Sequence, residues 1–346
     1  MEFTIGGRLE VRITPTDVGK RVSVRRRTDD GGTGTEFTDV VGVLTSWNNG
    51  VLSITRKSGE SVHIVESTVV AGKVVPAAPA RRRGPSASFG ELATVTARAW
   101  QPVESEALGD WRLRAAGGFT RRANSALPLG DPGLPVGEAL DRVRDWYEER
   151  GLPAYVQTAT GAEGTQELLC AELERRGWRR EVSAEVRIAA LAPVGDLEAE
   201  VRAVRLTREP DAAWLARYQR LAAPGPSALR VLGSGPSVWF ATVPGDTGDT
   251  GAPDADPLAA SAAPPAAIGR CVVDGRWAGF MAVEVAPEQR RRRLATTVMA
   301  ALARRAQDEG ASAAWLQVED DNEGARALYD GMGFATHHRY HHYRSA

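Results

Sequence analysis

The segment that most restricts the fold is residues 277–310, which read WAGFMAVEVAPEQRRRRLATTVMAALARRAQDEG. It begins with an apolar run at 277–285 that is typical of a strand, and Pro287 ends that run. Apolar residues then recur at helical spacing up to Gly310, which favours a helix C-terminus. These apolar residues are Leu294, Val298, Ala301, Leu302 and Ala306. Because residues 91–346 alternate strand-like and helix-like segments throughout, we expect an α/β fold with a mixed sheet.

A weak internal repeat accompanies this alternation. A second amphipathic helix is predicted in GEALDRVRDWYEERG, which ends at Gly151. Pro128 precedes Gly151 by the same number of residues as Pro287 precedes Gly310. Each copy then continues with a short strand, another helix and a glycine-aromatic pair. The pairs are Gly177-Trp178 and Gly333-Phe334. The pattern predicts two copies of one strand-helix-strand-helix-strand unit.

Residues 1–75 follow a different pattern, in which short runs alternate apolar and polar positions. The turn sequences Asn48-Asn49-Gly50 and Lys57-Ser58-Gly59 separate these runs and indicate hairpins. About five short strands predict a small antiparallel barrel of SH3-like type, and a scaffold or interaction role is favoured for it. Residues 76–90 are predicted to be a linker. The polar, low-complexity stretch 242–267 is predicted to be a disordered insertion between two strands.

Composition restricts the partners. The formal net charge of −1 over 346 residues disfavours bulk attraction to nucleic acid or to a membrane surface. The two cysteines, Cys170 and Cys271, lie far apart without metal-ligand spacing, which favours a reduced, cytoplasmic setting. We find no secretory signal and no apolar stretch approaching the roughly 20 residues that span a bilayer. The oligomeric state stays open.

Four consecutive arginines, Arg290 to Arg293, stand between the predicted strand and helix. They could form a nucleic-acid patch, a solvated helix end or a phosphate clamp. Lysine occurs only at Lys20, Lys57 and Lys73, so arginine supplies nearly all basic residues of this chain, and a run of arginines is weaker evidence of a binding site here. A helix N-terminus, however, aims unpaired N–H groups and the positive end of the dipole at one point. Arginine adds charge-assisted contacts to phosphate oxygens. The placement therefore favours a pyrophosphate-binding turn.

At this point the chain resembles the GNAT superfamily of N-acetyltransferases, which bind acyl-coenzyme A. The coenzyme A motif of that family is Gln/Arg-x-x-Gly-x-Gly/Ala after a strand ending in Val-x-Pro. It is matched here by Val285-Ala286-Pro287 and then by residues 290–295. The second family signature, Asn-x-x-Ala-x-x-Leu-Tyr-x-x-x-Gly-Phe, is complete. Its fixed residues are Asn322, Ala325, Leu328, Tyr329, Gly333 and Phe334. The motif-grade resemblance covers residues 277–346.

The resemblance implies an acetyl-CoA-dependent N-acetyltransferase, in which a primary amine of a small molecule or protein attacks the thioester directly in a ternary complex. Backbone groups of Val283 and Val285 would hold the pantetheine arm and polarise the carbonyl. Asn322 would hydrogen-bond the cofactor arm, and Tyr329 would act as general acid toward the leaving thiolate. The pyrophosphate would lie on the turn. The turn residues are Arg290, Arg291, Arg292, Arg293, Leu294, Ala295 and Thr296.

One residue departs from the family pattern, because Arg293 occupies the place of the first motif glycine. Glycine there lets the backbone approach phosphate without a Cβ in the way. Two alternatives follow. The exchange costs little if the φ of Arg293 is negative, or it weakens cofactor binding.

The general base is left open by the sequence. Glu284 and Glu319 are candidates, and either could instead be an exposed strand or loop charge. Four histidines lie near the C-terminus, but their separations do not define a metal site, and we expect no metal. They are His337, His338, His341 and His342.

The first copy of the repeat lacks the residues that the resemblance assigns to the cofactor. Leu173 stands at the place of Tyr329 and Gln166 at that of Asn322. We therefore expect a degenerate GNAT-like half at 91–195, which supplies sheet and cleft walls, and a catalytic GNAT domain at 196–346. An alternative function is a CoA-responsive regulatory or binding protein with little catalytic activity.

Overall fold

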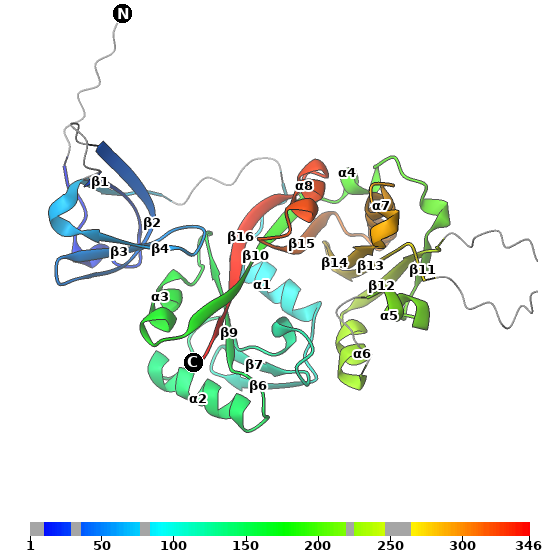
Figure 1. The fold of residues 1–346 in the computed structure, drawn as a ribbon, viewed down its shortest axis with the longest axis horizontal. Helices are drawn as coiled ribbons and strands as arrows, with labels where there is room; N and C mark the ends of the chain where they lie inside the picture. Colours follow the sequence, from blue (N-terminus) through cyan, green and yellow to red (C-terminus); the bar gives the residue numbers. More distant parts are fainter. Residues whose placement is uncertain (1–9, 29–35, 77–83, 219–224, 246–263) are drawn as a thin grey trace, which may run out of the picture. The chain divides into compact units, whose positions relative to one another are not determined.

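The computed structural model describes residues 10–28, 36–76, 84–218, 225–245 and 264–346 (Figure 1). They belong to two compact units. The first unit comprises Met1–Ala80, Val156–Ser183 and His337–Ala346, and the second comprises Arg81–Tyr155 and Ala184–Thr336. The domain boundaries expected from the sequence stay predictions.

The N-terminal part of the first unit is a five-stranded antiparallel sheet with the order β4-β3-β2-β1-β5, which confirms the small all-β domain. Asn49 and Gly50 join β2 to β3 with φ of 51° and 73°, as a primed hairpin turn requires. Its core includes Val22, Leu44 and Ile54, all fully buried. The strands are β1 (Arg21–Thr28), β2 (Glu36–Asn48), β3 (Val51–Thr55), β4 (Ser61–Val65) and β5 (Val69–Val74), with short 3-10 turns at Pro15–Asp17 and Glu66–Thr68.

The same unit includes α3 (Glu167–Arg175) and parts of three strands: β9 (Tyr155–Thr160), β10 (Arg179–Ala190) and β16 (Ala335–Arg344). Hydrogen bonds join these elements to the barrel. The Ser61 hydroxyl donates to Glu174 at 3.1 Å, and the Thr160 hydroxyl donates to the Lys57 carbonyl at 3.1 Å. The barrel is therefore packed against chain segments that are distant in sequence.

The second unit begins with α1 (Phe89–Arg98), a three-stranded sheet of order β6-β7-β8 and helix α2 (Val136–Glu148). The strands are β6 (Glu104–Leu108), β7 (Trp111–Ala115) and β8 (Leu127–Pro128), and a 3-10 turn at Arg121–Ala123 separates the last two. Helix α2 is followed by Gly151, whose φ is 62°. The predicted helix and its glycine stop are both present.

The main sheet of this unit has the order β11-β12-β13-β14-β15-β10, and in the first unit the strand order is β10-β16-β9. Strands β14 and β15 are parallel while the neighbouring pairs are antiparallel, so the sheet is mixed as expected. The remaining strands are β11 (Arg205–Thr207), β12 (Ser237–Val243), β13 (Ala267–Asp274), β14 (Trp277–Val285) and β15 (Ala313–Glu319). The remaining helices are α4 (Ala192–Gly195), α5 (Ala212–Arg217), α6 (Pro226–Leu232), α7 (Leu294–Asp308) and α8 (Glu323–Gly331), with 3-10 turns at Val201–Ala203 and Pro287–Gln289.

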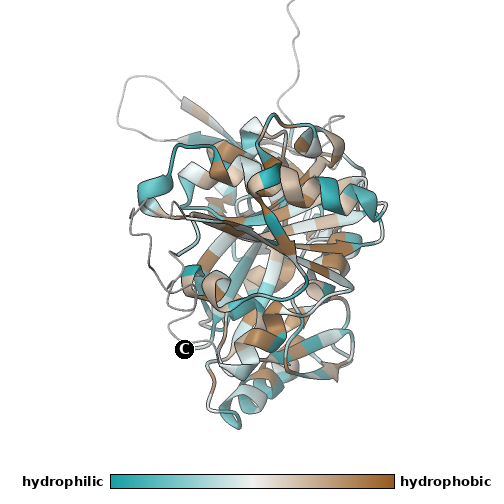
Figure 2. Cartoon of the chain, turned by 90° about the vertical axis from the view of Figure 1, so that its right-hand side faces the viewer, coloured by the Kyte–Doolittle hydropathy of each residue, from teal (hydrophilic) through white to brown (hydrophobic). Residues whose placement is uncertain are grey.

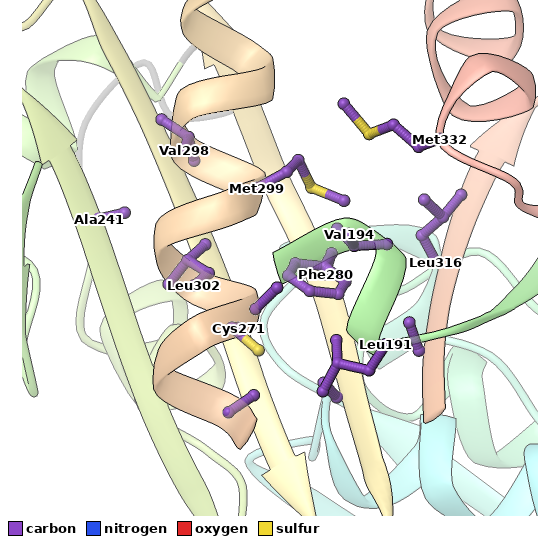
Figure 3. Packing of buried hydrophobic residues seen from close by; sticks show 14 of the residues in the cluster. Leu191, Val194, Ala241, Cys271, Phe280, Val298, Met299, Leu302, Leu316 and Met332 are labelled. Atoms are coloured by element: carbon purple, nitrogen blue, oxygen red, sulfur yellow. The ribbon is translucent and has the colours of Figure 1, made fainter. Parts of the chain in front are cut away.

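Two hydrophobic cores cover the two faces of this sheet, because successive strand residues alternate between them. Phe280 and Leu316 belong to the core that α7 packs on, and Met281 and Trp315 belong to the other. Figure 3 shows the first core, with Met299 of α7 beside Phe280. We call these the α7 face and the Trp315 face. In Figure 2 the strands inside the molecule carry the apolar colour and the outer sides of helices carry the polar one.

The predicted repeat is present in the order of elements. The first copy runs β8-α2-β9-α3-β10 and the second runs β14-α7-β15-α8-β16. Of the predicted linker, residues 77–83 lie outside the described residues, and of the predicted insertion, residues 246–263 do. The ends of that insertion belong to β12 and β13. No described helix is long and apolar enough to cross a membrane.

Candidate active site

Strand β14 contains a β-bulge near its C-terminal end. On β13, Ile268 and Arg270 are two residues apart. Their partners on β14, Glu284 and Met281, are three residues apart, so β14 carries one extra residue there. Within that step Ala282 has φ of 51°, a left-handed conformation that is uncommon for a residue with a Cβ. Bulges reorient backbone groups and concentrate at active sites.

The parallel pair of β14 and β15 separates at the same level. Register pairing runs from Trp277 with Ala313 to Phe280 with Leu316 and stops there, although β14 continues to Val285 and β15 to Glu319. Beyond Phe280 the edge of β14 that faced β15 is therefore without its strand partner. Backbone groups of Val283 and Val285, which the sequence assigned to the pantetheine arm, lie in this stretch.

The turn after β14 is tight and leads directly into α7. A 3-10 turn spans Pro287–Gln289, and Arg291 and Arg293 both adopt left-handed backbone conformations, with φ of 63° and 59°. The exchange of the motif glycine for Arg293 was expected to cost little only if the φ of Arg293 is negative, and this condition is not met. A left-handed conformation is what glycine adopts without strain, which explains the glycine of the family motif at this place.

The N-terminus of α7 has no side-chain cap. Arg293 is the N-cap residue and makes no capping hydrogen bond, and the first helical bond to a preceding carbonyl is from Thr297 N–H to the Arg293 carbonyl, at 3.0 Å. The N–H groups before Thr297 therefore face outward, as in anion-binding helix termini. The side chains of Arg290 to Arg293 are exposed. The turn thus presents backbone donors and four cationic side chains together.

Helix α8 carries the two side chains of the second signature. Asn322 is its N-cap, and the Asn322 Oδ1 accepts a hydrogen bond from Ala325 N–H at 3.1 Å. The half-buried Tyr329 packs on the α7 face, with its ring 5.9 Å from that of Phe334. Burial raises the pKa of Tyr329 to about 12, so the phenol keeps its proton at neutral pH.

A buried ion-pair network, which the sequence analysis missed, anchors α8 to β10. The guanidinium of Arg187 donates to Glu185 at 2.6 Å and to Asp330 of α8 at 2.9 Å. Glu185 also accepts from the Thr336 hydroxyl at 2.9 Å and pairs with Arg326 at 3.4 Å. The side chains of Arg187 and Glu185 are 5% and 3% exposed, so their charges depend on each other. The sequence signal that could have revealed this pair is Glu185 and Arg187, two opposite charges two residues apart in the mostly apolar run SAEVRIAA.

The two base candidates lie on the other face of the sheet. Glu284 is paired with Ile268, and paired residues of neighbouring strands share a face. Ile268 belongs to the Trp315 core, which places Glu284 on the Trp315 face. Glu319 is two residues from Gln317 and four from Trp315 on the same strand, so alternation gives it the same face. Tyr329 lies on the α7 face. The candidate acid and the candidate bases are thus on opposite sides of the separating strands.

The C-terminal histidines belong to the first unit and are mostly interior. His341 is fully buried and hydrogen-bonds the hydroxyls of Thr160 and Ser183 at 2.9 and 2.8 Å. Burial lowers the pKa of both His338 and His341 to about 3. No group of three or more His, Cys, Asp or Glu side chains with metal-binding geometry occurs in the part of the chain that the structure describes.

Two curated proteins are similar to this chain over most of its length. A curated relative, the probable histone acetyltransferase Rv0428c of Mycobacterium tuberculosis, is 29% identical over 93% of this chain and 93% of its own length. An uncharacterized N-acetyltransferase, YobR of Bacillus subtilis, is 25% identical over 73% of this chain and 97% of its own length.

Solved structures show the same fold at low sequence identity. A GCN5-related N-acetyltransferase from Kribbella flavida has a TM-score of 0.52 at 14% identity and covers 74% of this chain and 95% of its own. A tandem GNAT protein from the clavulanic acid biosynthesis pathway has a TM-score of 0.51 at 15% identity and covers 78% and 91%.

The fold and the motifs define a GNAT-type N-acetyltransferase, so the class expected from the sequence is confirmed. Residues 87–343 match the family model described as the probable histone acetyltransferase Rv0428c C-terminal domain, and residues 16–73 match the Rv0428c N-terminal Sm-like domain. The chain belongs to this Rv0428c family. The predicted barrel thus corresponds to a domain described as Sm-like.

Proposed function

We propose that this acetyltransferase transfers the acetyl group of acetyl-CoA to a primary amine of a small molecule or protein, by direct attack within a ternary complex. The observation that carries the proposal is the uncapped N-terminus of α7, which follows a turn with two left-handed arginines and lies next to the separating strands β14 and β15. Such a turn suits the pyrophosphate of the cofactor, and residues 290–296 would hold it.

The two faces of the sheet divide the reaction. With the pantetheine arm along Val283 and Val285, the thioester would lie where β14 and β15 have parted. An amine would then approach from the Trp315 face, where Glu284 and Glu319 can accept its proton directly or through water. A backbone N–H of the bulged strand would stabilise the oxyanion.

Tyr329 completes the proposal from the α7 face. Its pKa of about 12 keeps the phenol protonated, so it can donate a proton to the leaving thiolate. The Arg187 network fixes the helix that carries it. Asn322 caps the same helix, and capping its N-terminus is compatible with a hydrogen bond to the cofactor arm.

The test combines binding and turnover. Acetyl-CoA should raise the melting temperature of the full chain, and a thiol-release assay over a panel of amines should detect turnover. Tyr329→Phe should lower kcat by about 100-fold, since general acid catalysis contributes factors of that order, while leaving the cofactor Kd nearly unchanged.

Tyr155→Phe is the matched control, because it removes the hydroxyl of a buried tyrosine outside the signature, and it should leave kcat unchanged. Cofactor binding without turnover of any amine would favour the alternative of a CoA-responsive binding protein. Failure of millimolar acetyl-CoA to stabilise the protein would contradict the proposal altogether.

Two finer points stay proposals. The name of the M. tuberculosis relative points to a protein acceptor for that protein, and we include proteins among the acceptors on that ground alone. Cys170 and Cys271 are buried free thiols, which is compatible with a cytoplasmic setting.

A further inference from the structure

A preorganised loop on the Trp315 face holds a cation whose purpose the reaction above does not explain. The loop spans residues 116–124, and the buried Asn124 fastens it. The Asn124 Oδ1 accepts from the N–H groups of Ala116 and Gly118 at 2.8 and 3.0 Å. The Asn124 Nδ2 donates to the carbonyls of Phe119 and Thr120, both at 2.8 Å. All four hydrogen-bonding positions of this side chain are used, so the loop has one defined shape.

Thr120 has φ of 57° and ψ of 140°, a strained conformation for a β-branched residue. Its hydroxyl accepts from the indole N–H of Trp100 at 2.9 Å, which adds a further anchor to the loop. Strain of this kind persists only where the surroundings enforce it, and it concentrates at functional sites.

The loop presents Arg122. Its guanidinium lies over the ring of Trp100, at 4.8 Å from the centroid, and donates to the side-chain oxygen of Gln317. No salt bridge of Arg122 occurs within the described ranges, and the side chain is half-buried. An arginine in such surroundings usually pairs with a carboxylate or a phosphate.

A second cation strengthens the positive potential. Arg270 is fully buried, and its hydrogen-bond partners are neutral. They are the carbonyls of Leu232, Ser234 and Ala99 and the sulfur of Met281. Burial, followed by the positive charge of Arg122, lowers the pKa of Arg270 to about 9. Two guanidiniums thus stand near each other without an acidic partner among the described residues.

The position of Gln317 ties this cation to the active site. Gln317 directly follows Leu316, the last residue of β15 that pairs with β14. It is paired with Val186 and alternates with Trp315, so it lies on the Trp315 face together with Glu284 and Glu319. In the proposed reaction the amine approaches from this side, where Gln317, the hydrogen-bond partner of Arg122, lies two residues before Glu319 on β15.

We propose that Arg122 is a specificity residue that binds a carboxylate of the acceptor, so that the preferred acceptors are amines that also carry a carboxylate. The inference rests on the proposed transfer to an amine. Gln317 and Trp100 would hold the guanidinium in place, with one edge available for bidentate binding of the carboxylate. A free amino acid or an acidic peptide could supply this chemistry, and the experiment separates them.

The turnover experiment uses the full chain with acetyl-CoA and matched acceptor pairs that differ only in a carboxylate or a carboxamide. One pair is 6-aminohexanoate and 6-aminohexanamide, and the other is the dipeptides Lys-Glu and Lys-Gln, each acetylated at the α-amine and amidated at the C-terminus. We expect about tenfold or higher kcat/KM for the carboxylate member of the better pair, as charge-assisted hydrogen bonds suggest. Arg122→Gln should bring the ratio to about one, and Arg122→Lys should keep part of it.

Arg121→Gln is the matched control, because Arg121 is the exposed neighbour in the same 3-10 turn. It should leave the ratio unchanged. The cofactor Kd should be the same in all variants. A ratio near one in the wild type, or one that Arg122→Gln leaves intact in a folded variant, overturns the inference while leaving the proposed transfer standing.

A binding experiment keeps the two proposals separable. Glutarate has the carboxylates but no amine, so calorimetry with glutarate measures recognition alone. We expect binding to the wild type and to Arg121→Gln, and at least about tenfold weaker binding to Arg122→Gln. Glutarate binding of this pattern without turnover of any amine would refute only the proposed transfer. Equal binding by Arg122→Gln would refute the carboxylate site.

Discussion

The two copies of the strand-helix-strand-helix-strand unit end their helices alike and begin them differently. Each of the four helices in the two copies is followed by a glycine with positive φ. The N–H of the residue after that glycine donates to a carbonyl of the helix at 3.0 Å. These bonds join Leu152 to Tyr147 and Trp178 to Leu173 in the first copy, and Ala311 to Ala306 and Phe334 to Tyr329 in the second. The bonds from Trp178 to Leu173 and from Phe334 to Tyr329 show that Leu173 and Tyr329 occupy equivalent places.

The starts of the helices diverge. In the second copy, the long, bulged strand β14 leads into α7 through a turn with two left-handed arginines. In the first copy, the strand before α2 is the two-residue β8, and the N-cap of α2 is Pro135. Gln166 is the N-cap of α3, but its side chain turns back to accept from Ala159 N–H, whereas Asn322 caps α8.

This difference separates what folding needs from what the cofactor needs. A glycine after a helix lets the following N–H groups bond to the last helical carbonyls, which would otherwise lack partners. Any helix benefits from this, so both copies keep the glycines. Two left-handed arginines in one turn give folding no advantage, so their presence in the second copy alone indicates a ligand. We interpret the second copy as the reaction centre and the first as its support.

The largest effect should come from the helix that carries Tyr329. Arg187→Met leaves Glu185 buried with weaker pairing, and we expect the free energy of unfolding to fall by about 3 kcal/mol. Helix α3 is attached differently: Cys170 donates to Thr158 at 3.2 Å, and the Tyr343 hydroxyl donates to Glu174 at 2.9 Å. Denaturant unfolding measures the loss.

The double variant Glu185→Leu/Arg187→Met tests the reason for that loss. Removing both charges leaves no unpaired ion, so it should be closer to the wild type than Arg187→Met alone. If the two variants lose the same stability, the ion pair is not what anchors α8.

Acid should destabilise the first unit. Burial lowers the pKa of His341 in the first unit to about 3 from an ordinary 6.5, so its stabilising effect is complete above pH 6.5 and is lost as the pH falls toward 3. The neighbouring charges are Arg180 and Arg339, which act in the same direction. The loss should amount to roughly 3 kcal/mol between pH 6.5 and pH 4.

Tyr329 in the second unit gives the contrasting case. Its pKa is raised to about 12 from 10, so its stabilising effect is complete below pH 10 and is lost as the pH rises toward 12.

The acid prediction is checked by hydrogen exchange resolved by segment, which should show β16 opening first in acid. His341→Gln should flatten the acid limb, and an unchanged limb would show that other groups cause the acid sensitivity.

Much of this fold could be predicted from the sequence because it depends on local patterns. The runs of alternating residues gave the barrel strands, and helical spacing with terminal glycines gave α2 and α7. The bulge at Ala282 and the partners of Arg122 and Arg187 depend on contacts between segments far apart in sequence, which periodicity does not encode. The assigned roles of Asn322, Tyr329 and the turn residues stay predictions.

The smallest expected effect concerns the turn that distinguishes the second copy. Because Arg293 has φ of 59°, Arg293→Gly relieves backbone strain of about 1 kcal/mol and should leave acetyl-CoA affinity equal or tighter. Arg290→Gly also removes one exposed arginine charge, but Arg290 has φ of −65°, so no backbone strain is relieved there. Glycine at this place only raises the conformational entropy of the unfolded and unbound states. Calorimetric Kd values for the two variants separate backbone from charge. If both weaken binding equally, the arginine charges hold the cofactor; if only Arg290→Gly weakens it, the left-handed backbone of the turn is what the ligand requires, and the glycine of the family motif has its physical explanation.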